Sequence, residues 1–124
     1  MKEILKIIDE KLTDELGLNY EFGEMTKTPI TYPYWVGDYT DTEPTTEDGK
    51  DEFVVMLTGF ARGKFIDLEN QKQAIKDYFK NGVTVFTEAG SSVNIFYAGS
   101  LIVPSDEIDL KRSQINLKIK KWSV

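Results

Sequence analysis

The chain contains no cysteine and no histidine. Without cysteine it has no disulfide, no thiolate metal site and no cysteine nucleophile. Without histidine it lacks the most common general base and the most common metal ligand of proteins. Chemistry would therefore depend on carboxylates, lysines, tyrosines and hydroxyl groups, and none of these falls into a recognisable catalytic motif. We predict that the protein is not an enzyme and uses no metal or other cofactor.

Long hydrophobic runs are also missing. Apolar segments such as residues 101–103 are far shorter than the roughly 20 residues of a membrane-spanning helix. The first ten residues carry acids where a signal peptide has its apolar centre, so we expect no secretion by that route. With 124 residues, 40% of them hydrophobic, the chain is predicted to form one domain spanning residues 1–124. Its net charge of −6 opposes general nucleic-acid binding, which requires clustered Lys and Arg.

Two segments with strand character flank an acidic stretch. Residues 31–37 are rich in aromatic and β-branched side chains, and residues 52–61 form an apolar run of strand length. We predict two neighbouring antiparallel strands joined by a long, solvated excursion. Lys50 is the one basic residue in this stretch. Its acidic residues are Asp38, Asp41, Glu43, Glu47, Asp48 and Asp51. Loops longer than about 12 residues in a compact domain tend to be functional or disordered.

The remaining segments complete an α+β pattern. Apolar residues at helical spacing predict helices over residues 2–16 and 67–80, the second with Asp67 as its N-cap. Residues 83–87 and 93–97 flank a turn and predict a hairpin. Residues 108–122 predict a last strand, in which Ile115, Leu117 and Ile119 alternate with polar neighbours. We therefore predict one antiparallel sheet of four to five strands with two helices packed on one face.

Tests for specific binding motifs fail. If Gly49 is aligned with the EF-hand glycine, Pro44 and Val55 occupy ligand positions, so the acidic stretch is not an EF-hand. Residues 59–65 have the wrong glycine spacing for a phosphate-binding loop, and Phe65 stands where Ser or Thr would bind magnesium. Three interpretations of the acidic stretch remain open: a solvated loop, a contact with a partner, or a looser cation site.

The last predicted strand has a basic outer face, formed by Lys111, Arg112, Lys118, Lys120 and Lys121. Such residues can protect an exposed sheet edge against aggregation. Alternatively, they can contact an acidic surface, either nucleic acid or the acidic stretch of a neighbouring subunit.

The order of these elements is similar to that of a known protein family. With Tyr-Pro-Tyr-Trp-Val-Gly at residues 32–37 and Leu-Lys-Arg-Ser-Gln-Ile at residues 110–115, the chain resembles the tail-terminator or tail-completion (head–tail joining) proteins of long-tailed bacteriophages and prophages. The resemblance covers nearly the whole chain but includes no catalytic signature. It implies a non-enzymatic structural protein that forms a ring, commonly a hexamer, on the end of the tail tube. The tail-tube and head-connector proteins would be its partners, and DNA would pass through the lumen without specific binding. The protein would then be located in the virion, or in the host cytoplasm during assembly.

A closed ring of head-to-tail contacts requires two different, complementary patches on each subunit. Our hypothesis is that the acidic stretch of residues 38–51 contacts the basic strand of residues 111–121 in the next subunit. Two alternatives remain: a monomeric α+β domain that binds a small ligand between its sheet and its helices, and a hydrolase that uses carboxylates and a divalent metal.

Overall fold

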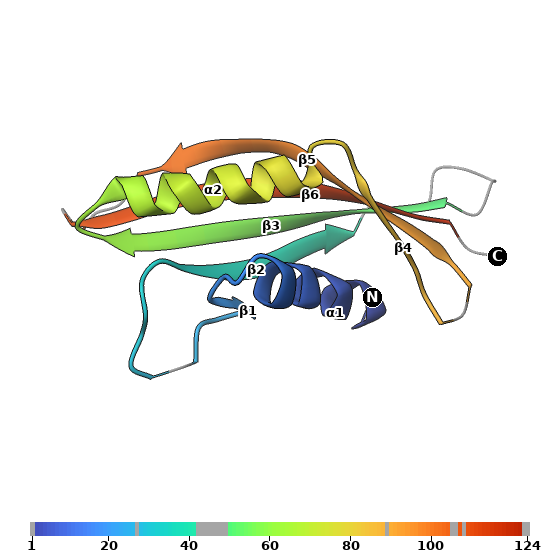
Figure 1. Ribbon diagram of the computed structural model, residues 1–124, viewed down its shortest axis with the longest axis horizontal. Helices are drawn as coiled ribbons and strands as arrows, with labels where there is room; N and C mark the ends of the chain where they lie inside the picture. The colour runs from blue at the N-terminus through green and yellow to red at the C-terminus, as the bar shows by residue number, and fades with distance from the viewer. Residues whose placement is uncertain are drawn as a thin grey trace.

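The computed structural model describes residues 2–26, 28–41, 50–88, 90–104, 107 and 109–122 (Figure 1). Within these residues, two helices, a π-helical turn and six strands follow one another. In order they are α1 (Lys2–Glu10), η1 (Lys11–Glu15), β1 (Tyr20–Phe22), β2 (Tyr34–Asp41), β3 (Lys50–Arg62), α2 (Phe65–Phe79), β4 (Val83–Phe86), β5 (Ser92–Val103) and β6 (Leu110–Trp122).

The six strands form one mixed sheet in the order β1-β2-β3-β6-β5-β4. β1 runs parallel to β2, and the other neighbouring pairs are antiparallel. The sheet curls into a half-barrel. The predicted antiparallel sheet of four to five strands with two helices on one face was therefore wrong. Sequence periodicity reports the buried side of each strand, but the parallel three-residue β1 and the curl depend on contacts between distant segments.

The core unites both helices with alternate residues of the sheet. Ile4 and Ile8 lie one turn apart on α1 and are buried, as are Leu68 and Ile75 on α2. They belong to one hydrophobic cluster that includes the side chain of Trp35 on β2. Full burial of one such side chain contributes about 1.5–3 kcal/mol, so this cluster is the main stabilising feature of the fold. α2 contacts β3, β5 and β6, whereas α1 contacts β1 (Figure 1).

Several local predictions were confirmed. β2 and β3 are antiparallel neighbours, β4 and β5 form the hairpin, and Ile115, Leu117 and Ile119 are buried at alternate positions of β6. Each strand that flanks the acidic stretch reaches further into it than predicted, because β2 continues to Asp41 and β3 begins at Lys50.

Two element boundaries differ from the prediction. α2 begins at Phe65 after Lys64, which makes no side-chain capping hydrogen bond, so Asp67 is not the N-cap. Gly63, with φ of +80°, reverses the chain immediately after β3 and allows the helix to begin early. Residues 93–97 and 101–103 lie in one strand, since an irregularity between Tyr97 and Ser100 continues β5 past Gly99. No helix among the described residues is both long and apolar enough to cross a membrane.

Candidate functional site

The acidic residues singled out in the sequence divide between the strands and the segment that joins them. Asp38 is exposed on β2, on the opposite side of the sheet from the buried Trp35. Asp41 is the last residue of β2, opposite Phe53, and Asp51 is on β3 opposite Lys121. Glu43, Glu47 and Asp48 lie outside the described residues.

The basic residues of β6 divide between the two faces of the sheet. Successive residues of a strand point to opposite faces. Arg112, Lys118 and Lys120 therefore share the face opposite the buried Ile115, which we call the open face. Lys111 and Lys121 have the parity of Ile115 and lie on the other face, near the two ends of β6. The five residues therefore do not form one basic surface.

Part of the predicted charge complementarity is satisfied within one chain. β3 and β6 are neighbours, with Glu52 opposite Lys120, and the Glu52 carboxylate lies 3.9 Å from the Nζ of Lys118. A surface ion pair of this kind contributes about 0–1 kcal/mol. It nevertheless means that Lys118 and Lys120 already face an acid of their own chain. Arg112, further along β6, lies opposite Phe60 instead.

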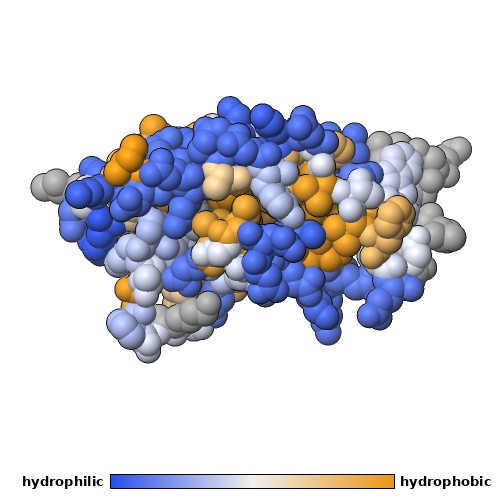
Figure 2. Space-filling view, viewed as in Figure 1, coloured by the Kyte–Doolittle hydropathy of each residue, from blue (hydrophilic) through white to orange (hydrophobic). Residues whose placement is uncertain are grey.

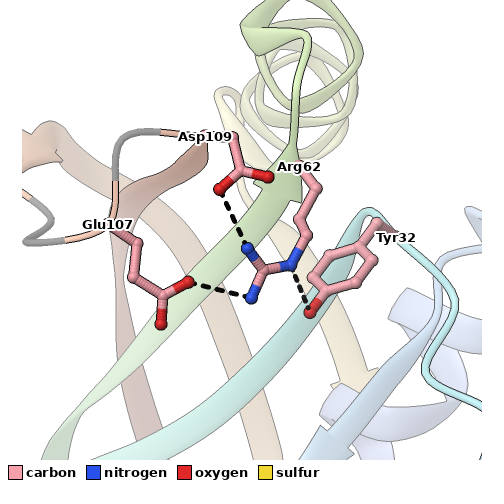
Figure 3. Close-up of polar contacts among 4 residues, drawn as sticks. All are labelled: Tyr32, Arg62, Glu107 and Asp109. Carbon is pink, nitrogen blue, oxygen red and sulfur yellow. Dashed lines mark hydrogen bonds and ion pairs between the residues drawn. The ribbon is translucent and has the colours of Figure 1, made fainter.

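A cluster around Arg62 joins the end of β3 to two distant segments (Figure 3). The Arg62 Nε donates to the Tyr32 hydroxyl at 3.2 Å, and its two terminal nitrogens lie 2.9 Å from Glu107 and 3.1 Å from Asp109. The hydrogen bonds to Tyr32 and Glu107 raise the pKa of Arg62 above its ordinary value. The cluster fixes the chain before β2 and the chain before β6 to the same strand end. Nothing in the local sequence links residues 32, 62, 107 and 109, so this cluster was not predicted from the sequence.

Aromatic rings extend this cluster over the open face. The rings of Tyr34 and Phe60 stack with their centroids 4.8 Å apart, and the Tyr32 ring lies 5.3 Å from that of Tyr34. Burial, and secondly the neighbouring Tyr32, raise the pKa of Tyr34. The rings pack on one another across β2 and β3, as expected for cross-strand pairs that stabilise a sheet.

The first edge of the sheet is half covered. β1 pairs with Trp35–Gly37 of β2, and among the described residues no strand pairs with the outer side of Asp38–Asp41. The amide of Trp35 donates to the Asn19 carbonyl and the carbonyl of Gly37 accepts from Gly23, so both point outward. Because backbone groups alternate in direction, Tyr39 and Asp41 also point theirs outward. Consistently, the Tyr39 amide donates to the carboxylate of Asp38 at 2.8 Å.

The opposite edge is half covered in the same way but is chemically different. β4 pairs with residues 92–95 of β5, and no strand in the described part of the chain pairs with the outer side of residues 96–103. Residues 83–104 contain a single charged residue, Glu88. Large apolar side chains are exposed here: Phe86 is 72% exposed, Leu101 49% and Ile102 63%. Hydrophobic surface is visible beside β4 and near the end of β5 (Figure 2).

Two pockets lie at the margins of the sheet. One, of about 300 Å³, lies between α1 and β4 and is lined by Ile7, Val85 and Phe86 together with charged residues. The other, of about 240 Å³, lies at the end of β5 beside Ile102 and Phe65. The first pocket lies between a helix and a sheet strand, as the small-ligand alternative expects, whereas side chains of the core cluster fill the interior between the sheet and the helices. Among the described residues, no three carboxylates gather into a group that could hold a metal ion.

Comparison with known proteins adds no assignment: no protein-family model matches the chain, and no curated protein matches it significantly in sequence. Functional inference therefore depends on the residues and the geometry described above.

Proposed function

We propose that the protein is a non-catalytic structural subunit that assembles head to tail into a ring, of the kind that caps the tail tube of a long-tailed bacteriophage or prophage and helps to join tail to head. The order of elements supports this proposal. A short N-terminal helix, a strand containing Tyr34-Trp35-Val36-Gly37, the long β3, a helix, a hairpin and a terminal strand follow one another as in the family that the sequence resembles.

The observation that carries the proposal is the presence of two unlike, half-covered sheet edges. One edge is acidic, with Asp38 exposed, and the other is uncharged, with Leu101 and Ile102 exposed. A ring requires two different complementary patches on each subunit, whereas a two-fold dimer requires only one self-complementary patch. Unlike edges on opposite ends of one sheet meet the first requirement.

The proposed partners follow from the proposed role. The subunit would contact copies of itself, six in a ring in the manner of the resembled family, and the tail-tube and head-connector proteins above and below the ring. DNA would pass through the lumen without specific binding, because a net charge of −6 repels phosphates. The protein would be found in the virion, or in the host cytoplasm during assembly.

Solution mass tests this proposal. Sedimentation of the full chain over a range of concentrations and salt should show a closed oligomer that forms at high concentration, and negative-stain images of that fraction should show rings. The contacts that close the ring are mainly edge hydrogen bonds and apolar surface, so salt should weaken the oligomer without abolishing it. A chain that stays monomeric at every concentration would contradict the proposal.

A further inference from the structure

The two bare edge segments are placed so that copies of the sheet can continue one another. β1 covers the part of β2 before Asp38, and β4 covers the part of β5 before Phe96. What remains uncovered is the second half of β2, Asp38–Asp41, and the second half of β5, residues 96–103, beyond which the strand ends. After the irregularity at Gly99, residues 100–103 form a regular stretch equal in length to Asp38–Asp41.

We infer that residues 38–41 of one copy add to residues 100–103 of the next copy as an antiparallel strand, so that the sheet continues from subunit to subunit. This inference rests on the proposed ring and names its contact. Addition of a strand to an exposed edge pairs backbone groups that have no strand partner, here including the outward amide of Tyr39, which donates to the Asp38 carboxylate. The Asp38 carboxylate that now accepts from this amide would be released.

Strand direction fits this pairing. β2 and β3, β3 and β6, and β6 and β5 are each antiparallel, so β2 runs opposite to β5 within a subunit. A copy rotated about an axis along the strands keeps these directions, and it therefore presents β2 antiparallel to the β5 of its neighbour. The covering strands do not interfere: β1 of the incoming copy lies beyond the end of β5, and β4 lies beyond the end of the incoming residues 38–41.

The faces and charges fit as well. Leu101 lies opposite Gln114 and Val103 opposite Arg112, so both have open-face parity, as do Asp38 and Thr40. If Thr40 lies opposite Leu101, then Asp38 lies opposite Val103, with Arg112 on the next strand. In this register Asp38 and Arg112 are two strand spacings apart, about 9.6 Å. This distance is within roughly one Debye length at moderate salt, so the two charges attract one another. On the other face, Tyr39 lies beside Ile102 and its pocket.

Pairing of β5 with β5 of a second copy is the competing arrangement. It would place the basic β6 strands of the two copies three spacings apart, about 14 Å, with like charges facing one another. That repulsion is weak at this distance, but the arrangement gains no attraction and leaves the acidic edge unused. It also closes a dimer rather than a ring. Charge and closure therefore both favour the head-to-tail contact.

The absence of cysteine makes a direct test possible. Side chains directly opposite one another on antiparallel strands have Cβ atoms about 4.5–5.5 Å apart. Two cysteines at such positions are close enough for mild oxidation to join their thiols in a disulfide. The variants Thr40→Cys and Leu101→Cys, each prepared separately in the full chain, should form a mixed covalent dimer when combined. A mixture of Thr40→Cys with Phe86→Cys is the matched control. Phe86 is more exposed than Leu101, but it lies on the covering strand β4 and outside the inferred contact.

The outcomes are distinct. We expect cross-linking in the Thr40/Leu101 mixture to exceed that of either variant alone, and that of the control, by at least tenfold. Efficient cross-linking of Leu101→Cys with itself would overturn the inference in favour of β5–β5 pairing. Equal cross-linking in all mixtures would also overturn it. If wild-type rings form while the Thr40/Leu101 mixture does not cross-link, the inference fails and the proposed function stands; if no oligomer forms, the proposed function itself fails.

Discussion

The two edges of the sheet differ in how they are protected. On the β1–β2 side, residues 20–41 contain four acids and one lysine, and the edge strand β1 has three residues. On the β4–β5 side, residues 83–104 contain one charged residue, and β5 leaves eight residues uncovered. Charges and short edge strands are common protections against unwanted pairing. β4 is also short, with four residues, so the two edges differ in charge rather than in strand length, and an uncharged edge bearing exposed Leu and Ile is suited to a specific contact.

The edges also differ in how closely one glycine on each side is packed. Tyr20 of β1 is 2% exposed, and its ring lies directly over Gly37 of β2. On the other side, nothing lies within 4 Å of the position that a side chain at Gly99 would occupy. Gly37 is thus a tightly packed position and Gly99 an open one, although β5 itself is anchored in the core by the fully buried Val93 and Ile95. The following predictions probe this difference.

The largest effect is expected for Gly37→Ala. The added Cβ would lie 2.2 Å from the Tyr20 hydroxyl oxygen and 3.0 Å from two ring carbons, so the ring must shift and β1 must loosen. Overpacking of this kind costs about 1–3 kcal/mol of unfolding free energy, measurable by urea denaturation. The same substitution in a Tyr20→Phe background should cost less, because the closest atom is gone. An equal cost in both backgrounds would show that the hydroxyl is not the obstacle.

Gly99→Ala should have a smaller effect on stability, and one of a different origin. Gly99 has φ of +119°, a region that L side chains rarely adopt, so the cost is backbone strain of about 1–3 kcal/mol with no steric clash added to it. Tyr20→Phe should not reduce this cost, since the two sites are at opposite edges. Partial rescue by Tyr20→Phe would contradict the separation of the edges.

Tyr20→Phe by itself tests the packed edge through pH. The Tyr20 hydroxyl is buried without a hydrogen-bond partner among the described residues, and burial, with a smaller contribution from Asp9, raises its pKa above the ordinary 10.0. A raised pKa in the folded state means that stability falls as pH rises above 10, by up to about 1.4 kcal/mol per pH unit. The variant should lack this component and be up to about 1 kcal/mol more stable at neutral pH. Parallel stability curves above pH 10 would contradict this account.

Arg62→Gln should have the smallest effect on stability. The side chain is exposed, so water and salt screen its contacts with Glu107 and Asp109. The urea midpoint should fall less than in Gly37→Ala, and the difference from wild type should shrink as salt is added. A large, salt-independent loss would show that the cluster stabilises the strand ends through packing rather than charge.

The sequence predicted the parts of the fold that depend on local patterns. The apolar run of β3, the hairpin and the alternation of β6 are encoded within each segment, and all were found. The curl, the parallel β1 and the continuation of β5 past Gly99 depend on pairing between segments and were missed. The Arg62 contacts span 30 and 47 residues along the chain, beyond any periodicity.

The candidate surfaces were predicted in part. The division of the basic residues was readable from the sequence, because Lys111 and Lys121 share the odd numbering of the inward Ile115, and this signal was overlooked. The half-covered edges could not be predicted, since they require knowledge of which part of each strand has a neighbour. Most of the acidic stretch lies outside the described residues, so its proposed contact remains a prediction.

Mixing two edge variants tests the central claim most directly. Leu101→Glu places an acid on the β5 edge, where the acidic edge of the next copy should be repelled, and Asp38→Arg places a cation on the β2 edge, where Arg112 should repel it. Each variant alone should sediment as a monomer. Mixed in equal amounts, the two variants restore both contacts. The substituted edges carry opposite charges, and the unchanged β2 edge of the Leu101→Glu copy meets the unchanged β5 edge of the Asp38→Arg copy. The mixture should therefore associate into closed oligomers in which the two variants alternate. A mixture that remains monomeric, or a variant that dimerises alone, would contradict association through two unlike edges.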